Sequence, residues 1–397
     1  MTSISDSDED DYLVLKKRAR MAKSSCPYLR TINRFALDFD FDKVCSVTLS
    51  NTNVYACLVC GRYFQGRGKE TPALIHSMEH GHHLFINLQD AKTWCLPDNY
   101  EVAGDDSLED IVFNLDPKIF PQDLKKLPES AVSLTGSEYH PGLIGLNQTK
   151  DASYLNAALH ALCTVVPVRD SFVLMNHPTD NKLSRSLSDL FKKICNWRSF
   201  KGVTSPHEFL QQVSVKSKGE YFASHADPAK FLNWLLMELK HTAISNTFRG
   251  ESPFAGPFFV LSLDLPPMPV FKELATVMLS DLLVNQVQQF PEYLIIHFRR
   301  FVKNNFFLEK NSTLVRFPMK GLSWDGCGDV QYSLVAVVSH EGKPEGGLFK
   351  TCALHPVSNQ WFECEALRVR KILPESVPLY ESYIHIWRRS STTLESH

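Results

Sequence analysis

GLNQTKDASYLNAALHAL, residues 145–162, joins a turn-rich approach to a run with the apolar spacing of a buried helix. The apolar residues of that run recur every three or four positions, as they do on one face of a helix: Leu155, Ala158, Leu159 and Leu162. Ser153 stands at the start of the run, where a serine is typical of a helix N-cap. The stretch therefore predicts a packed helix that begins near Ser153.

The chain beyond this stretch divides into a helical half and a strand half. Helical apolar spacing recurs in residues 184–197, 206–215 and 228–243. Later segments are rich in β-branched and aromatic residues, which is typical of strands: 258–265, 293–301, 332–340, 349–355, 361–369 and 383–389. Helices followed by a sheet indicate an α+β fold. We expect one large domain over residues 140–390.

Composition limits the class of protein. A chain of 397 residues suits two domains, and 44% hydrophobic with 22% charged residues is normal for a globular protein. The formal net charge of −2 gives no general electrostatic reason to bind nucleic acid. Ten cysteines without a secretory signal favour a reducing compartment, where cysteine means metal, catalysis or core. A membrane span needs a run of about 18 apolar residues, and the sequence contains none.

The segments outside the large domain have distinct compositions. Residues 1–25 are polar and charge-segregated, so we expect a disordered tail; its basic cluster is either a nuclear import signal or a solvated face: Lys16, Lys17, Arg18, Arg20 and Lys23. Residues 26–103 form a compact, cysteine- and histidine-rich region. Residues 104–139 read as a linker with a short helix over 121–127, and 391–397 as a second tail.

A metal-ligand pattern lies in the compact region. Cys57 and Cys60 form a C-x2-C pair before a glycine, and four histidines follow within eight residues: His76, His80, His82 and His83. A helix that begins near Thr71 projects His76 toward the cysteines, and the chain past its end returns His82. The spacing predicts a structural Zn²⁺ on Cys57, Cys60, His76 and His82. The alternative is a surface histidine cluster beside two buried thiols.

The other cysteines of this region are more typical of a core. Cys26 and Cys45 are candidates for a second ion but have no obvious fourth partner, and packing is the more common role of such cysteines. We interpret Cys95 as structural.

Three phrases make residues 26–103 resemble the zinc finger of ubiquitin-specific proteases: CLVCGRYFQGRG (57–68), HGHHLFINL (80–88) and WCLPDNYEV (94–102). The resemblance implies a zinc-finger fold that often captures the ubiquitin tail with an arginine and an upstream tryptophan. Arg62 matches the arginine, but no tryptophan of this domain precedes Cys57. The expectation is therefore the fold, with ubiquitin as a weak or absent partner.

Residues 140–390 resemble the catalytic domain of the same proteases, a papain-like fold with a helical thumb and a β-rich palm. The phrases that carry this resemblance are GLIGLNQTKDASYLNAALHAL (142–162), FPEYLIIHFRRF (290–301) and the histidine-box region over 332–367. Active members often carry two C-x2-C pairs in a fingers subdomain. No such pair follows Cys60 and residues 241–259 are few, so we expect reduced fingers without that zinc site.

The catalytic positions implied by the resemblance lack the chemistry of a cysteine protease, which needs a thiolate, a histidine base and a residue that orients the base. The cysteine position falls on Ser153 or Lys150, depending on the alignment, the histidine on Leu348 and the third member on Glu365. With the second alignment the oxyanion asparagine falls on Gly145. We predict that the domain is not an enzyme.

No other residues supply a replacement pair. Cys163 is expected to be a core cysteine, and His340 and His355 are expected to point away from the cleft.

The whole chain resembles a subgroup of protease-like splicing factors associated with the U4/U6.U5 tri-snRNP, through CPYLRTINRFALDFDF (26–41) and RRFVKNNFFLEKN (299–311) among other phrases. The resemblance implies a nuclear, non-catalytic scaffold with tri-snRNP proteins as partners. The alternatives are a ubiquitin-binding adaptor and a weakly active deubiquitinase. Four basic residues are candidates for RNA contact, or simply a solvated palm edge: Arg299, Arg300, Lys303 and Lys310.

Overall fold

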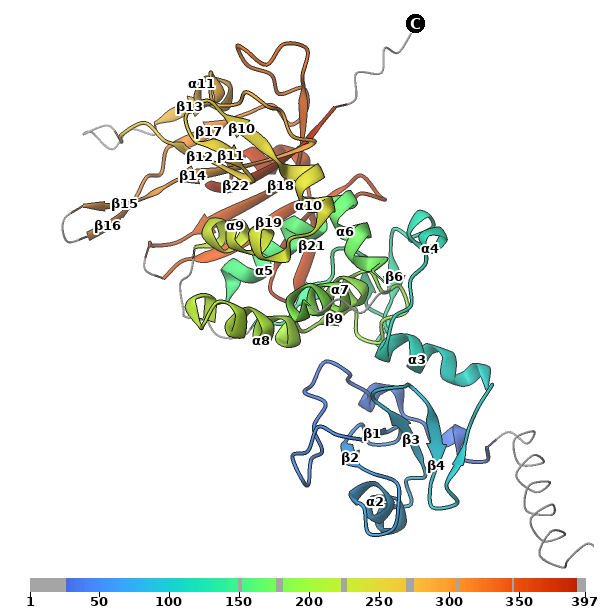
Figure 1. Ribbon diagram of the computed structural model, residues 1–397. Coiled ribbons are helices and arrows are strands. Elements are labelled where there is room, and N and C mark those ends of the chain that lie inside the picture. The colour runs from blue at the N-terminus through green and yellow to red at the C-terminus, as the bar shows by residue number, and fades with distance from the viewer. Residues whose placement is uncertain are drawn as a thin grey trace, which may run out of the picture. The chain divides into compact units, whose positions relative to one another are not determined.

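A computed structural model of the chain describes residues 26–148, 152–175, 181–222, 227–268, 275–304, 307–344 and 346–390 (Figure 1). The predictions for the two tails, for the basic cluster and for Lys150 lie outside these residues. The chain forms two compact units. The first contains residues up to Lys118 together with 133–136 and 198–201, and the second contains the rest. Among the residues described, no helix is long and apolar enough to cross a membrane.

The first unit is built on an antiparallel five-stranded sheet in the order β2-β1-β3-β4-β5. Its strands are β1 (Val54–Cys57), β2 (Tyr63–Gln65), β3 (Leu84–Asn87), β4 (Thr93–Cys95) and β5 (Tyr100–Glu101). Helix α2 (Pro72–His80) has a proline in its first turn and ends at Gly81, whose φ of 67° is readily adopted by glycine. This geometry confirms the predicted helix near Thr71.

The predicted linker is partly wrong, because much of it folds into the first unit. Helix α3 (Glu109–Leu115) follows the short turn η3 (Asp106–Leu108). Leu108, Ile111 and Leu115 are buried in one cluster with core residues of the sheet. Composition misses this because the buried apolar residues are only three, one in η3 and two in α3. The helix expected over 121–127 is present as α4 (Pro121–Lys125).

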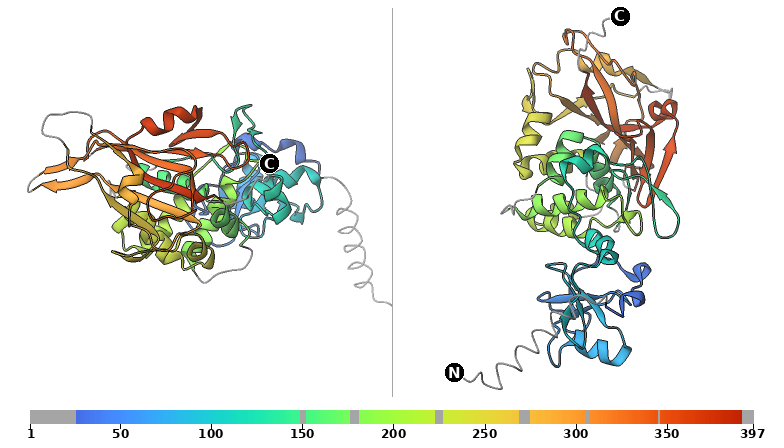
Figure 2. Two further views of the ribbon diagram at one scale, coloured as in Figure 1. Left: turned by 90° about the horizontal axis from the view of Figure 1, so that it is seen from above. Right: turned by 90° about the vertical axis from the view of Figure 1, so that its right-hand side faces the viewer.

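Six helices of the second unit form a thumb, seen together on one side of the palm in Figure 2. They are α5 (Ser153–Cys163), α6 (Val166–Val173), α7 (Lys182–Ile194), α8 (His207–Lys216), α9 (Pro228–Leu239) and α10 (Thr242–Phe248). All eleven residues of α5 are buried, so the predicted apolar stripe is part of a helix that is enclosed all round. Thr351 of the palm donates its hydroxyl to the Ala157 carbonyl at 2.8 Å.

The palm is a seven-stranded sheet in the order β12-β14-β22-β18-β19-β20-β21, parallel between β12 and β14 and antiparallel elsewhere. Its strands are β12 (Val260–Asp264), β14 (Tyr293–Arg299), β18 (Tyr332–Glu341), β19 (Leu348–Leu354), β20 (Trp361–Glu365), β21 (Arg368–Ile372) and β22 (Ser382–Arg389). Helices followed by these strands confirm the predicted α+β fold.

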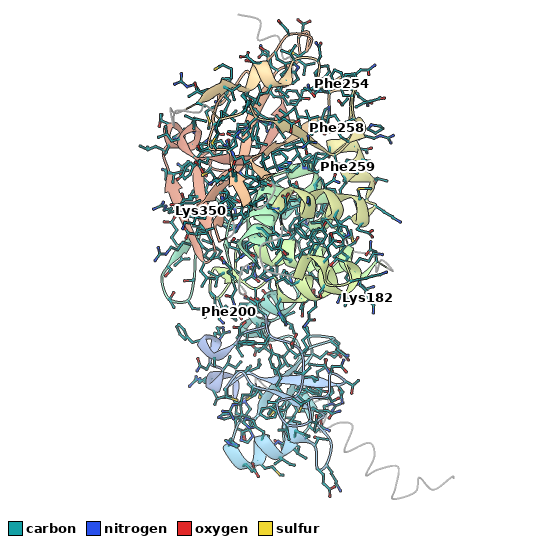
Figure 3. The ribbon with its side chains drawn as sticks, turned by 90° about the vertical axis from the view of Figure 1, so that its left-hand side faces the viewer. Lys182, Phe200, Phe254, Phe258, Phe259 and Lys350 are labelled. Atoms are coloured by element: carbon teal, nitrogen blue, oxygen red, sulfur yellow. The ribbon has the colours of Figure 1, made fainter. Side chains whose placement is uncertain are left out.

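Short elements surround the palm. The two-stranded pairs are β6 (Ala131–Val132) with β7 (Glu138–Tyr139), β8 (Gly145–Leu146) with β9 (Val203–Thr204), β10 (Gly250–Ser252) with β11 (Gly256–Phe258), β13 (Thr276–Met278) with β17 (Leu314–Arg316), and β15 (Phe301–Asn304) with β16 (Phe307–Lys310). Helix α11 (Leu279–Leu283) follows β13. Phe254 and Phe258, labelled in Figure 3, belong to the β10–β11 hairpin, which occupies the expected position of the reduced fingers.

Candidate functional site

The four predicted metal ligands meet at one place in the first unit. Cys57 ends β1, Cys60 lies in the following turn, His76 projects from α2, and His82 lies between α2 and β3. Their ligand atoms all lie within 4.8 Å of one another. His76 is 6% exposed and Cys57 is fully buried. Two thiols and two imidazoles at this spacing could hold a metal ion.

The separations between the donor atoms fit a tetrahedral zinc ion. Zn–S bonds of about 2.3 Å and Zn–N bonds of about 2.0–2.1 Å place sulfur and nitrogen ligands about 3.6 Å apart and two nitrogens about 3.3 Å apart. Cys57 Sγ lies 3.6 Å from His82 Nδ1, and Cys60 Sγ lies 3.4 Å from His76 Nε2. The two nitrogens are 3.0 Å apart. The donor set therefore has the chemistry and the dimensions that zinc prefers.

The electrostatics of the cluster favour metal-binding protonation states. A hydrogen bond from Cys57, together with the Arg62 backbone N–H, lowers the pKa of Cys60 to about 4. The same bond and burial raise the pKa of Cys57. Burial lowers the pKa of His76, which keeps its ring neutral. Zinc requires thiolates and neutral imidazoles, so one thiolate and one neutral ring are prepared before binding.

The remaining histidines of the patch support the cluster from outside. The His80 and Phe64 rings both stack on the His76 ring, with 4.5 Å and 4.2 Å between ring centroids, respectively. His83 Nδ1 lies 3.1 Å from the Ser77 hydroxyl, which donates to the Leu96 carbonyl. These contacts fix the end of α2 from which the chain returns His82.

Cys26, Cys45 and Cys95 are buried and do not assemble a second group of ligands among the residues described. The Tyr100 hydroxyl donates to Cys26 Sγ at 3.0 Å. Cys45 Sγ accepts from two backbone N–H groups, of Val47 and Thr48, each at 3.4 Å. These thiols therefore have the structural roles that the sequence favoured.

The second unit contains a cleft of about 590 Å³, lined by two of the positions that the resemblance assigns to the protease triad. Ser153, at the start of α5, and Leu348, at the start of β19, both line it. Ser153 Oγ accepts the Phe349 backbone N–H at 3.2 Å. Leu348 offers no group that could take a proton from a serine. The cleft therefore contains the Ser153 hydroxyl, but Leu348 occupies the position that the resemblance assigns to the histidine base.

The prediction that Ser153 caps α5 is wrong. Ala152 is the N-cap residue, and no side chain caps the helix. Ser153 is the first helical residue, and its oxygen accepts from the palm strand instead. The hydroxyl thus links the thumb to β19, a contact between residues 196 positions apart in sequence.

Gly145, on which the alternative alignment places the oxyanion asparagine, is outside the residues that line the cleft. Gly145 is buried in β8, where a Cβ atom would lie 2.4 Å from the Leu367 carbonyl oxygen, so close packing explains this glycine. Gln148 lines the cleft instead, five residues before Ser153.

Glu365, the third degenerate position, is outside the residues that line the cleft. Lys350, labelled in Figure 3, lies 3.3 Å from Glu365 and 2.6 Å from Glu341. Both carboxylates together raise the pKa of Lys350, with the hydrogen bond to Glu341 as the largest cause. Glu365 thus pairs with a lysine of the neighbouring strand.

The sequence did not predict the two histidines that line the cleft. His340 was expected to point away, but it lines the cleft together with His297. A Cβ at Gly347 would lie 1.9 Å from His340 Nε2, so the glycine makes room for the imidazole. His355 is buried and bonded to Pro141 and Ser358, as expected of a structural histidine.

Two further predictions concern buried residues. Cys163 is fully buried, as predicted for a core cysteine. Arg300, named among surface basic residues, is instead fully buried and donates to the carbonyls of Ser382, Asn311 and Thr313. These hydrogen bonds connect Arg300 to residues in or beside β16, β17 and β22. Its guanidinium group is therefore not exposed at an edge of the palm.

Two family models match the chain. The model described as ubiquitin carboxyl-terminal hydrolase matches residues 144–387, and the one described as a Zn-finger in ubiquitin-hydrolases and other proteins matches residues 45–107.

Similar proteins cover nearly the whole chain. The human protein named ubiquitin carboxyl-terminal hydrolase 39 is 36% identical over 92% of this chain and 80% of its own length. The Schizosaccharomyces pombe protein named probable mRNA-splicing protein ubp10 is 34% identical over 92% of this chain and 88% of its own. A solved structure, entitled crystal structure of an essential yeast splicing factor, has 31% identity and a TM-score of 0.84, and covers 92% of this chain and all of that one.

Proposed function

Since the chain belongs to the ubiquitin carboxyl-terminal hydrolase family, we propose that it is a non-catalytic scaffold in pre-mRNA splicing. The observation that carries this proposal is similarity along both units, at 34% identity, to a relative named as an mRNA-splicing protein. The solved splicing factor, which matches over its full length, supports it independently.

The cleft supports the absence of catalysis. A serine hydroxyl keeps its ordinary high pKa unless a base takes its proton, and is then a poor nucleophile at neutral pH. Leu348 cannot act as that base, and Ser153 Oγ is engaged by the Phe349 N–H. Glu365 is paired with Lys350 and has no imidazole to orient. The three degenerate positions Ser153, Leu348 and Glu365 therefore serve packing and strand pairing.

We assign a structural zinc ion to Cys57, Cys60, His76 and His82. The zinc-finger family model over residues 45–107 and the donor separations both support this assignment. The ion joins the end of β1 to the end of α2, so it would hold the helix against the sheet.

The proposed partners are proteins of the U4/U6.U5 tri-snRNP, and the proposed compartment is the nucleus. Resemblance of residues 26–41 and 299–311 to splicing factors of that particle supports both. The test is purification of the tagged full chain from nuclear extract, with blotting for U4, U5 and U6 RNAs. Recovery of all three is expected, and recovery of none contradicts the proposal.

The competing functions are separated by two measurements on the same preparation. Turnover of a fluorogenic ubiquitin substrate that is abolished by Ser153→Ala would establish a deubiquitinase. Binding of free ubiquitin tighter than about 100 μM, which corresponds to roughly 5.5 kcal/mol, without snRNA recovery would establish an adaptor.

A further inference from the structure

The cleft of the second unit has a wall of contacting rings. Ring centroids lie 4.8 Å apart for His297 and Tyr383, 5.4 Å for Tyr383 and Phe301, 5.0 Å for Phe301 and His340, and 4.8 Å for His340 and Phe349. Phe301 and Phe349 are only partly buried. The cleft therefore offers aromatic surface to a ligand.

Two buried nitrogen atoms of this wall lack hydrogen-bond partners. They are Nε2 of His297 and Nδ1 of His340, whose side chains are 8% and 3% exposed. Burial lowers the pKa of each ring to about 4, so both are neutral and each has one donor and one acceptor nitrogen. Each unpaired nitrogen has almost no accessible surface, so the two rings contribute uncharged aromatic surface to the wall and no hydrogen-bonding group.

The cleft carries charges of both signs. Lys230 and Arg299 are exposed and line it, opposed by Asp227. Asp227 accepts from the Ala229 and Lys230 backbone N–H groups at the start of α9, so its charge already caps that helix. Arg299 pairs with Asp264, which leaves Lys230 as the cation that most readily meets an anion.

From the ring wall and Lys230, we infer that the cleft binds a nucleotide of single-stranded RNA. A base stacks on Phe301 and Phe349, and its phosphate meets Lys230. Stacking of unpaired bases on aromatic rings beside cations is the common mode of single-strand recognition. A volume of about 590 Å³ is in the range of small-ligand sites.

The same observations disfavour an extended peptide. A peptide in a protease cleft needs free backbone donors for its carbonyl groups, but the Phe349 N–H is occupied by Ser153. A glycine-rich peptide tail would also leave the exposed ring surface unused. This inference is independent of the scaffold role, because the chain can co-purify with snRNAs through protein contacts whether or not the cleft binds RNA.

The test is fluorescence anisotropy of labelled oligoribonucleotides with the full chain. Mixed-sequence single strands are expected to bind with a Kd of tens of micromolar, and the same sequence as a duplex at least tenfold more weakly. Lys230→Glu and Phe301→Leu are each expected to weaken binding about tenfold. Lys371→Glu, the same charge change on an exposed strand residue outside the cleft, is expected to weaken it less than twofold.

Photocrosslinking with 4-thiouridine locates the site. Crosslinks within residues 293–310 or 348–354 support the inference. Equal binding by the Lys230 and Lys371 variants, crosslinks only elsewhere, or binding of a Gly-Gly peptide but of no RNA overturns it.

Discussion

The zinc-ligand cluster and the cleft differ in how their residues meet. In the cluster, four side chains from β1, α2 and the turns beside them converge within 4.8 Å, with a complete set of ligands. In the cleft, Ser153 and Leu348 also converge, yet they share no chemistry. Both places are present in the fold, but only the first brings together side chains that can act on one ligand. The zinc-ligand cluster and the cleft are both well packed, so the identity of their side chains decides what each of them can do.

The largest effect should follow from breaking the cluster. Cys60→Ser removes one thiolate, and structural zinc sites contribute about 10–16 kcal/mol of binding free energy that is coupled to folding. We expect loss of bound zinc and proteolysis of the first unit, measured by metal analysis and limited trypsin digestion. Cys26→Ser is the matched control and should keep one zinc ion per chain. Retention of zinc by the Cys60 variant contradicts the assignment.

Packing in the second unit should give the next largest effect. Leu159 is fully buried in α5, and Leu→Ala changes in such positions cost about 2–5 kcal/mol. We expect Leu159→Ala to lower the free energy of unfolding by this amount, measured by urea denaturation with tryptophan fluorescence. Leu379→Ala, at a side chain 74% exposed, should change it by less than about 0.5 kcal/mol. Equal effects would mean that α5 is not central to the core.

Acidification is expected to destabilise the palm because His385 is buried in it. Its ring lies among Phe298, Phe317 and Trp387, and burial lowers its pKa to about 3. Between pH 6.5 and 3, His385 is protonated in the unfolded chain but neutral in the folded chain, so stability falls as pH falls. This histidine contributes up to about 1.4 kcal/mol per pH unit, or about 2 kcal/mol between pH 7 and 5.

His385→Phe should therefore lessen the loss of stability on acidification by about 2 kcal/mol, measured by urea denaturation at pH 7 and pH 5. The change in stability between the two pH values, not stability at either one, is the diagnostic quantity. An unchanged pH dependence would show that His385 is protonated in the folded state.

The sequence predicted the cluster better than the cleft because the cluster depends on short-range geometry. One helix of nine residues, with a proline at its start and Gly81 after its end, carries His76 and returns His82. The α+β fold also followed from local periodicity. The cleft depends on long-range contacts: His340 faces it because Gly347, across the β18–β19 hairpin, leaves space for its ring. No local pattern encodes that pairing, nor the burial of Arg300 beneath three carbonyls.

The smallest expected effect concerns Ser153, whose position suggested a nucleophile and whose contacts show a packing role. Its hydroxyl accepts one backbone hydrogen bond from Phe349, and such a bond contributes about 0.5–1.5 kcal/mol. Ser153→Ala should lower the free energy of unfolding by that amount, several-fold less than Leu159→Ala on the same helix. Ubiquitin-substrate turnover should be indistinguishable from background in both the wild type and the variant. If Ser153→Ala destabilises as much as Leu159→Ala, the hydroxyl has a larger structural role in joining thumb and palm than its single hydrogen bond indicates. If it instead abolishes measurable turnover, the cleft supports a chemistry in which Leu348 takes no part, and the contrast with the zinc-ligand cluster fails.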